Sequence, residues 1–364
     1  MHKQFRRPII TAAYISFQPT DYYKTQLYTG TGAENAQTFP QTAAMQPDFT
    51  WIKARTGSKS HRLFDSPRGV TNWIASDNNG AESTTAESLK SFDSDGFTLG
   101  TYDHVNDNTV TFASWNWKGG TTSGITTNGS TTITPSSYSF SAAAGISIVK
   151  YTGNYTSGAK VAHGLGAVPE MIIVKRLDAA AAWAVYMKAM GNTKNMKLNT
   201  NANATTSTAY WNDTTPDSVN FTLGNNTDVN NSGTAHVAYC FAPIKGFSRF
   251  GNYSGNGNAN GPMIYTGFRP AFLMTKSITD AGDNDWHMMD DKRNGFNPEN
   301  WLIQADLAIA EETGSSYEWV DFVSNGFKMR TNNGSINSSG ANYSYMAFGE
   351  FPFVSSNSIP TTAR

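Results

Sequence analysis

The chain has 364 residues, and its 27 basic and 28 acidic side chains leave a formal net charge of −1. Proteins that bind nucleic acid normally carry a basic excess that neutralises phosphates, so this balance argues against that class. Aromatic residues make up 13% of the chain, too many for a disordered protein. The 32 glycines and abundant Asn, Ser and Thr favour turns over helix interiors, so the composition predicts an all-β fold.

The N-terminal segment carries Lys3, Arg6 and Arg7 ahead of a short apolar run. Because Thr and Pro interrupt that run and no small-residue cleavage site follows, we expect a basic docking arm and not a signal peptide. No stretch approaches the ~20 apolar residues that cross a bilayer, so we expect no membrane insertion. The single cysteine, Cys240, lies in an apolar run and is expected to be a buried hydrophobic residue without a disulfide partner.

An internal repeat organises the rest of the chain. Each of three copies opens on an aromatic-small-Gly triplet, and a later proline introduces an apolar strand that ends six residues on in lysine. A second strand, a Phe-bearing strand after a turn, and a closing strand follow in the same order. The triplets are 28–30, 151–153 and 253–255, and the Pro-to-Lys strands are 47–53, 169–175 and 270–276. The second strands are 61–65, 183–187 and 286–290. The Phe-bearing strands with their turns are 95–100, 219–224 and 325–330, and the closing strands are 112–115, 236–239 and 345–348. Such regularity indicates three related units.

Each unit of roughly 100 residues is too long for a solenoid rung and suits a small β-domain. Short strands separated by Gly and Asn turns are typical of a sandwich or jelly roll. The Pro-to-Lys strands are continuously apolar, as expected where both faces of a sheet are covered. Segments 85–90 and 305–312 are the best candidates for helical turns. We therefore predict an all-β chain of three tandem related β-sandwich (jelly-roll-like) domains with few short helical turns.

Composition also sets the expected boundaries. The expected segments are a basic arm with a first extended segment (1–27), the first repeat (28–118), a flexible Gly/Ser/Thr linker (119–144), the second repeat (145–249), the third repeat (250–353) and a C-terminal tail (354–364). The second and third repeats are joined closely, so we expect them to pack as a rigid pair.

Candidate catalytic groups are few. The paired carboxylates are Asp93/Asp95, Asp290/Asp291 and Glu311/Glu312. The first pair is typical of a turn cap, the second is expected at a solvated strand end, and neither recurs in another repeat. The six histidines show no metal-binding spacing. We therefore expect no catalytic residues, no cofactor and no metal, and we predict a non-enzymatic protein.

Exposed aromatic rings could stack on sugars, although a ring in the core is the commoner arrangement. The candidates are Trp73, Trp183, Trp211, Trp286, Trp301 and Trp319. Trp211 lies in a polar turn and is the best candidate for exposure. Together with Tyr210 and Asn212 it forms a possible glycan contact.

Four runs in the first repeat (51–58, 63–71, 94–100 and 113–119) and their counterparts later in the chain (224–226, 237–242, 267–272 and 325–330) resemble a repeated domain of bacteriophage virion proteins. That domain is most familiar from marine phages that infect cyanobacteria and other ocean bacteria. The resemblance covers residues 20–353. It implies a virion component, often of a fibre or other surface appendage, and it brings no catalytic residues.

Repeated β-domains without a catalytic constellation serve as scaffolds or recognition surfaces. We therefore expect a structural protein on the exterior of a bacteriophage virion, assembled in the host cytoplasm, as part of a tail or head fibre that contacts the host surface. A capsid decoration protein is the alternative within that class, and a carbohydrate-active depolymerase is the alternative outside it. The expected partners are other virion proteins (capsid, portal or tail components), a host-surface glycan, and further copies of the chain as a trimer.

Overall fold

The computed structural model describes residues 17–40, 44–279, 284–314 and 319–350. Strands dominate it, and its helices are single turns: α1 (Asp103–Asn106), α2 (Thr208–Trp211), α3 (Thr227–Asn230), α4 (Gly334–Asn337), η1 (Pro19–Asp21) and η2 (Lys188–Met190). The all-β prediction is confirmed. The two expected helical turns are wrong, because 85–90 is a turn that runs into a strand and 305–312 is turn and loop. The basic arm with Lys3, Arg6 and Arg7 and the tail 354–364 lie outside the described residues.

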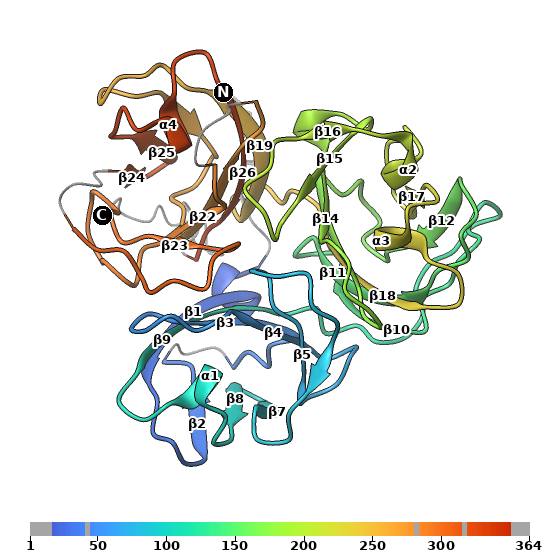
Figure 1. Cartoon of the computed structure of the whole chain (residues 1–364), viewed down its shortest axis with the longest axis horizontal. Helices are drawn as coiled ribbons and strands as arrows, with labels where there is room; N and C mark the ends of the chain where they lie inside the picture. The colour runs from blue at the N-terminus through green and yellow to red at the C-terminus, as the bar shows by residue number, and fades with distance from the viewer. Residues whose placement is uncertain (1–16, 41–43, 280–283, 315–318, 351–364) are drawn as a thin grey trace, which may run out of the picture.

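Three lobes surround a common centre (Figure 1). We call them module 1 (23–117), module 2 (137–241) and module 3 (248–348), after their first and last strands. Each contains a larger antiparallel sheet in which strands from the start and end of the module are neighbours and the Pro-to-Lys strand follows. The shared strand order explains why the same landmarks recur three times in the sequence.

The larger sheet of module 1 has the strand order β1 (Tyr23–Thr29), β9 (Thr111–Trp117), β3 (Phe49–Ala54), β4 (Arg62–Asp65). The larger sheet of module 2 has the order β10 (Ser137–Ser141), β11 (Ile146–Thr152), β18 (Ala235–Phe241), β13 (Met171–Arg176), β14 (Ala184–Met187), β15 (Lys194–Lys197), β16 (Thr205–Thr206). The larger sheet of module 3 has the order β19 (Ser248–Ser254), β26 (Asn342–Phe348), β21 (Phe272–Ser277), β22 (His287–Asp290), β23 (Ile303–Gln304).

The smaller sheets are β2 (Asn35–Thr38), β8 (Gly96–Leu99), β7 (Leu89–Asp93) in module 1; β12 (Ala159–Ala162), β17 (Asn220–Leu223) in module 2; and β20 (Met263–Tyr265), β25 (Gly326–Met329), β24 (Val320–Val323) in module 3, with an additional pair β5 (Asn72–Trp73), β6 (Ser83–Thr84) in module 1.

The larger sheets are covered on both faces. One face of each contributes to a single hydrophobic cluster that draws on all three modules, and the other face packs in a cluster that belongs to its own module. Every residue of β3 and β21 is accordingly buried, as the continuous apolar pattern of the Pro-to-Lys strands indicates. Each module therefore has a core of its own on one side of its larger sheet and shares a second core with the other two modules on the opposite side.

Three equivalent aromatic residues mark the centre. Trp117, Phe241 and Phe348 each lie on the closing strand of their module, directly opposite the first residue of β3, β13 and β21, respectively. Their ring centroids are 5.8 Å apart for Trp117–Phe348, 5.8 Å for Phe241–Phe348 and 6.5 Å for Trp117–Phe241. The three equivalent rings therefore form a nearly equilateral triangle, as expected for modules arranged about an approximate threefold axis.

The expected flexible linker is docked on module 2 at several points. Within 119–144, strand β10 pairs with β11, and Thr121 forms a bridge with Phe140. Ile133 is buried and lies beside Val161 at the edge of β12. The expectation of a free tether is thus wrong for these residues, because a few apolar side chains among the Gly, Ser and Thr are enough to dock the segment.

The aromatic-small-Gly triplets hold the single-turn helices against the strands. Tyr28, Tyr151 and Tyr253 donate hydrogen bonds of 2.6–2.8 Å to carbonyl oxygens of α1, α3 and α4. Gly30, Gly153 and Gly255 lie so close to the ends of these helices that an added Cβ would lie 2.1–2.3 Å from a carbonyl oxygen. The triplet is therefore required by packing, since no other residue fits the glycine position.

A buried asparagine completes each of these contacts. Asn230 in α3 donates to the carbonyls of Thr156 (3.0 Å) and Gly224 (2.7 Å) and accepts from the amide of Asn154 (2.9 Å). The corresponding Asn106 and Asn337 make the same pattern of bonds.

Replacing this asparagine should destabilise the protein strongly. We expect Asn230→Ala to lower the free energy of unfolding by about 2–4 kcal/mol, because it leaves several buried backbone groups without partners. Denaturant titration followed by Trp fluorescence measures the change. The exposed Asn225→Ala is the matched control and should cost less than about 0.5 kcal/mol. Equal effects of the two variants would contradict a structural role for Asn230.

Candidate functional site

The predicted sugar-contact residues do not form a surface site. The Trp211 side chain is 1% exposed and its ring packs edge-on against Tyr186, while Tyr210 is also buried. The prediction that Trp211 is exposed is wrong, because the single turn of α2 directs its ring into the core of module 2. Asn212 ends that turn in the left-handed conformation and accepts a hydrogen bond from Ser157. Among the other tryptophans that were candidates, Trp183, Trp286 and Trp319 are buried as well.

The carboxylate Asp290 lies inside the protein and not at a solvated strand end, so that expectation is also wrong. Its Oδ2 accepts hydrogen bonds from Arg293 (2.6 Å) and from the indole of Trp115 in module 1 (3.0 Å). At the equivalent position in module 1, Asp65 accepts from Arg68 and from the hydroxyl of Tyr239 in module 2 (2.6 Å). Each Asp–Arg pair is buried by the neighbouring module and links the two modules.

The third interface uses apolar residues at the same places. The strand registers equate Asp65 and Asp290 with Met187, and equate Trp115 and Tyr239 with Met346. Both methionines belong to the shared core cluster. The interface between modules 2 and 3 is therefore closed by hydrophobic packing, where the other two use a buried ion pair.

The lysines that end the Pro-to-Lys strands also join modules. Their side chains are buried, and each ammonium donates to the backbone of the neighbouring module. Lys53 donates to the carbonyl of Ile309 (2.7 Å), Lys175 to that of Asn79 (3.4 Å), and Lys276 to that of Asn201 (3.0 Å). Module 1 thus binds module 3, module 2 binds module 1, and module 3 binds module 2, which closes a ring.

A second set of contacts follows the same cyclic direction. The indole of Trp183 donates to the carbonyl of Ala75 (3.0 Å) and the indole of Trp286 to that of Lys197 (2.9 Å). His61 occupies the corresponding position in module 1, and its Nε2 lies 2.9 Å from the carbonyl oxygen of Gln304. The recurrence of Lys and of an aromatic residue at these landmarks was the sequence signal of the interfaces, although it did not reveal which module each residue contacts.

Burial lowers the pKa of Lys53, Lys175 and Lys276 to about 8. In the unfolded chain a lysine has a pKa near 10.4, so between pH 8 and 10 the unfolded state binds more protons than the folded state. The contribution of such a lysine to stability therefore increases as the pH rises through this window.

We expect the unfolding free energy of the wild type to increase relative to that of Lys276→Met by about 2 kcal/mol between pH 8 and pH 10. Urea titrations of both proteins at each pH measure it. The exposed Lys188→Met serves as the control and should show no such shift. Parallel curves for wild type and Lys276→Met would contradict a lowered pKa of Lys276 in the folded state.

Further carboxyl groups of module 3 gather in its interior. Glu299 is 1% exposed, and burial together with the charges of Asp290 and Asp291 raises its pKa to about 8. Burial also raises the pKa of Asp291 and of Glu350. These groups do not line the surface pocket described next. In the parts of the chain that the structure describes, no three His, Cys, Asp or Glu side chains are placed so that they could hold a metal ion.

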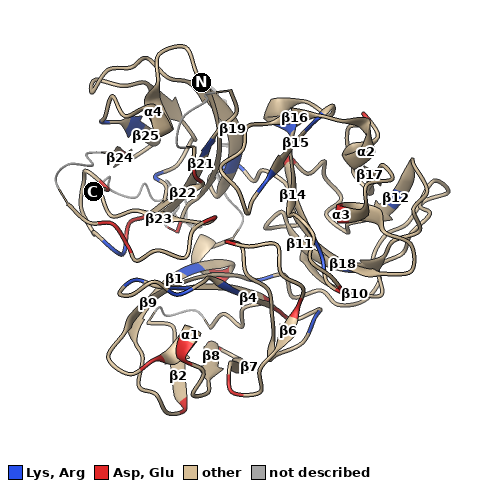
Figure 2. Cartoon of the chain, viewed as in Figure 1, with Lys and Arg blue, Asp and Glu red and all other residues tan. Residues whose placement is uncertain are grey.

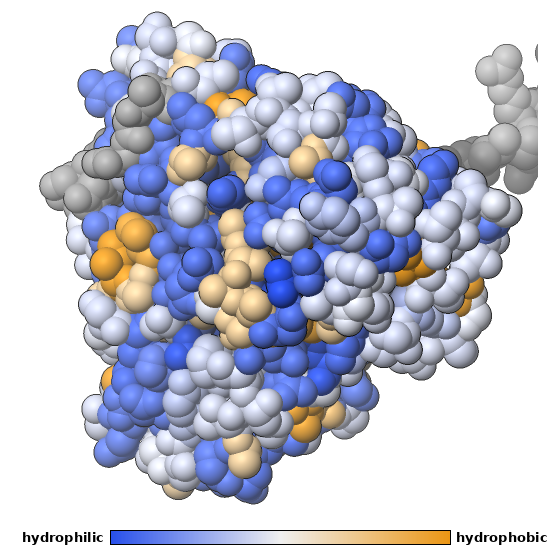
Figure 3. Space-filling model, turned by 45° about the vertical axis from the view of Figure 1, so that its right-hand side comes forward, coloured by the Kyte–Doolittle hydropathy of each residue, from blue (hydrophilic) through white to orange (hydrophobic). Residues whose placement is uncertain are grey.

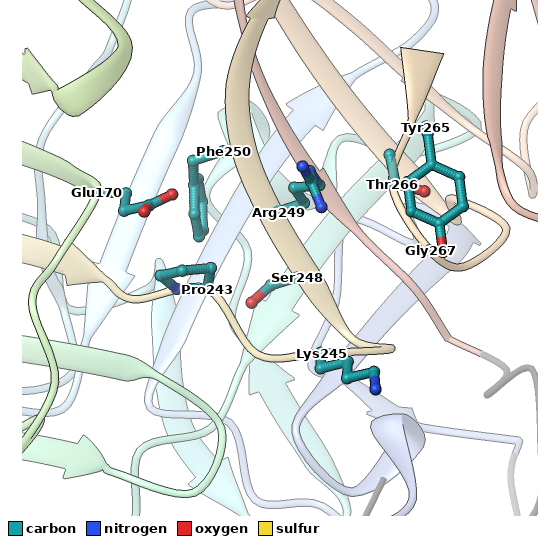
Figure 4. Close-up of a pocket in the computed structure, with 9 residues that line it drawn as sticks. All are labelled: Glu170, Pro243, Lys245, Ser248, Arg249, Phe250, Tyr265, Thr266 and Gly267. Carbon is teal, nitrogen blue, oxygen red and sulfur yellow. The ribbon is translucent and has the colours of Figure 1, made fainter. Parts of the chain in front are cut away.

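Charged residues of both signs are scattered over the three lobes (Figure 2), and hydrophobic residues form small separate patches on the face in Figure 3. A pocket of about 420 Å³ lies where modules 2 and 3 meet (Figure 4). It is lined by Glu170, Pro243, Lys245, Ser248, Arg249, Phe250, Tyr265, Thr266 and Gly267. This volume lies within the usual range of ligand pockets. The pocket is therefore the candidate binding site.

Strand β19 divides the pocket lining. Because side chains alternate along a strand, Arg249 points to the side opposite Ser248 and Phe250. Figure 4 shows its guanidinium directed toward Tyr265 and Thr266, whereas Glu170 faces Phe250 on the other side. The guanidinium carbon of Arg249 lies 6.0 Å from the centroid of the Tyr265 ring, and the Tyr265 side chain is 57% exposed.

The charges of the pocket favour an anion on the Arg249 side. The carboxylate of Glu170 is paired with Lys188 at 2.7 Å. None of the ion pairs among the described residues involves Arg249. Arg249 lies beside the phenol of Tyr345, whose pKa is raised by burial. Sequence reasoning missed this site, because its residues come from distant segments and none belongs to a recognisable motif.

The fold and its interfaces define one all-β unit of three modules around a shared centre. A family model described as a domain of unknown function (DUF7483) matches residues 18–352, so the chain belongs to that family. The match spans all three modules, as expected if they form one unit. No curated protein and no solved structure matches the chain. Within the described residues, no helix has the length and apolar character needed to span a membrane.

Proposed function

We propose that this chain is a non-enzymatic structural protein on the exterior of a bacteriophage virion, in a tail or head fibre that contacts the host surface. The observation that carries the proposal is the closed ring of modules, in which the recurring Lys, Trp and Asp residues are used to join the modules. In the proposal each module is a jelly-roll-like sandwich whose outer loops are free to contact partners. The resemblance of the repeated motifs to phage virion domains supports the location.

The positions of the carboxyl groups favour this role over a depolymerase. A glycoside hydrolase needs two carboxyl groups on opposite sides of one substrate cleft. Asp290 is held by Arg293 and Trp115 in the interior, and the carboxylate that lines the pocket, Glu170, is bound by Lys188. Neither arrangement places a pair of carboxyl groups around a common cleft.

The approximate threefold arrangement also favours a second candidate, a capsid decoration protein. A single chain that presents three equivalent modules around one axis matches the symmetry of a threefold position on a shell. In the fibre version, three chains associate as a homotrimer, and the basic arm with Lys3, Arg6 and Arg7 docks on capsid, portal or tail proteins.

Both versions require the chain to be part of the virion. We expect quantitative mass spectrometry of gradient-purified particles to detect it at a constant ratio to the capsid protein. A ratio of about one chain per three capsid subunits, as expected for one chain at each threefold position, supports decoration, and a far lower ratio supports the fibre. Light scattering of the isolated protein adds the oligomeric state, with a trimer expected for the fibre. Absence of the chain from purified particles would refute the proposal.

A further inference from the structure

We propose that the pocket between modules 2 and 3 binds an acidic saccharide, with the Tyr265 ring as the stacking surface and Arg249 as the partner of the sugar carboxylate. This inference rests on the proposed contact with the host surface for its biological role, because acidic sugars are presented there. The binding itself follows from the size, exposure and charge of the pocket.

The stacking surface is built on a strand that holds its side chains in place. Tyr265 and Met263 lie on the same face of β20, with exposed fractions of 57% and 45%, while Ile264 between them is buried in the core of module 3. The pairing of β20 with β25 fixes the direction of both exposed side chains. An exposed aromatic ring next to an apolar side chain offers the flat surface that the apolar face of a pyranose can cover.

The cation beside the ring selects an anionic sugar. Arg249 projects from the edge strand β19 into the same part of the pocket, and its planar guanidinium can bind a carboxylate through two parallel hydrogen bonds. The nearest acidic group of the lining, Glu170, lies on the other side of β19 and is neutralised by Lys188. Among the described residues that line the pocket, none on the Tyr265 side carries a carboxylate that would repel the ligand.

Comparison of the three modules shows that the pocket is not a by-product of the module fold. The strand registers equate Tyr265 with Thr38 and Ala162. They equate Arg249 with Lys24 and Ser147, which are both buried. Module 3 thus combines an exposed aromatic ring with an exposed cation at positions where the other modules have small or buried residues.

The test is titration calorimetry with the full chain and a defined probe, digalacturonate, against its neutral counterpart digalactose. We expect digalacturonate to bind at one site with at least about tenfold higher affinity than digalactose, which is the usual effect of a charge-assisted pair. We expect Arg249→Gln to remove this preference and Tyr265→Ala to weaken binding of both sugars by about tenfold. Tyr155→Ala, which removes an equally exposed tyrosine in module 2, is the control and should bind like the wild type.

Other results would overturn the inference. No heat with either sugar, or equal affinity for both, would exclude an acidic saccharide as the ligand. Competition by inorganic phosphate at the concentration of the sugar would show that any anion suffices and would also refute it. Loss of affinity in Tyr155→Ala equal to that in Tyr265→Ala would place binding elsewhere. Because mass spectrometry of particles tests the virion role separately, failed sugar binding in a chain that is present in virions refutes this inference alone.

Discussion

The contact among Trp117, Phe241 and Phe348 is the constraint on which the rest of the structure depends. These rings occupy equivalent positions in the three modules and meet at one point, so each large sheet has to turn its inner face toward the same centre. Further aromatic pairs cross the interfaces beside them, including Phe49–Tyr239 with centroids 4.5 Å apart and Tyr23–Phe348 at 5.6 Å. Burial of these rings removes a large apolar area from water and makes the modules mutually dependent.

The polar groups at the interfaces follow from that burial. Once the inner faces are brought together, the lysine that ends each Pro-to-Lys strand and the Asp–Arg pairs of modules 1 and 3 can no longer reach bulk water. Buried cations and carboxylates are tolerated only with well-placed partners, and the neighbouring module supplies them as backbone carbonyls, an indole and a phenol. Such groups stabilise one particular docking of the modules.

Much of this architecture could be predicted from the sequence, and the remainder could not for a physical reason. The repeat, the all-β class and the two-sided burial of the Pro-to-Lys strands depend on local patterns, and the structure contains all three. The burial of Trp211 could not be predicted, because a single helical turn leaves no periodic pattern from which the direction of its ring could be inferred. The burial of Asp290 could not be predicted either, because it depends on Trp115, which lies 175 residues away in the sequence. The pocket likewise combines Glu170 with Tyr265, and no local pattern connects them.

Because the three modules share one centre, they are expected to fold as one cooperative unit. Hydrogen exchange measured by mass spectrometry across a denaturant series tests this claim for each module separately. We predict that peptides from β9, β18 and β26 lose protection together, with one common free energy of opening. If the strands of one module exchange at a clearly lower denaturant concentration while the other two remain protected, the modules are independent domains and the account is contradicted.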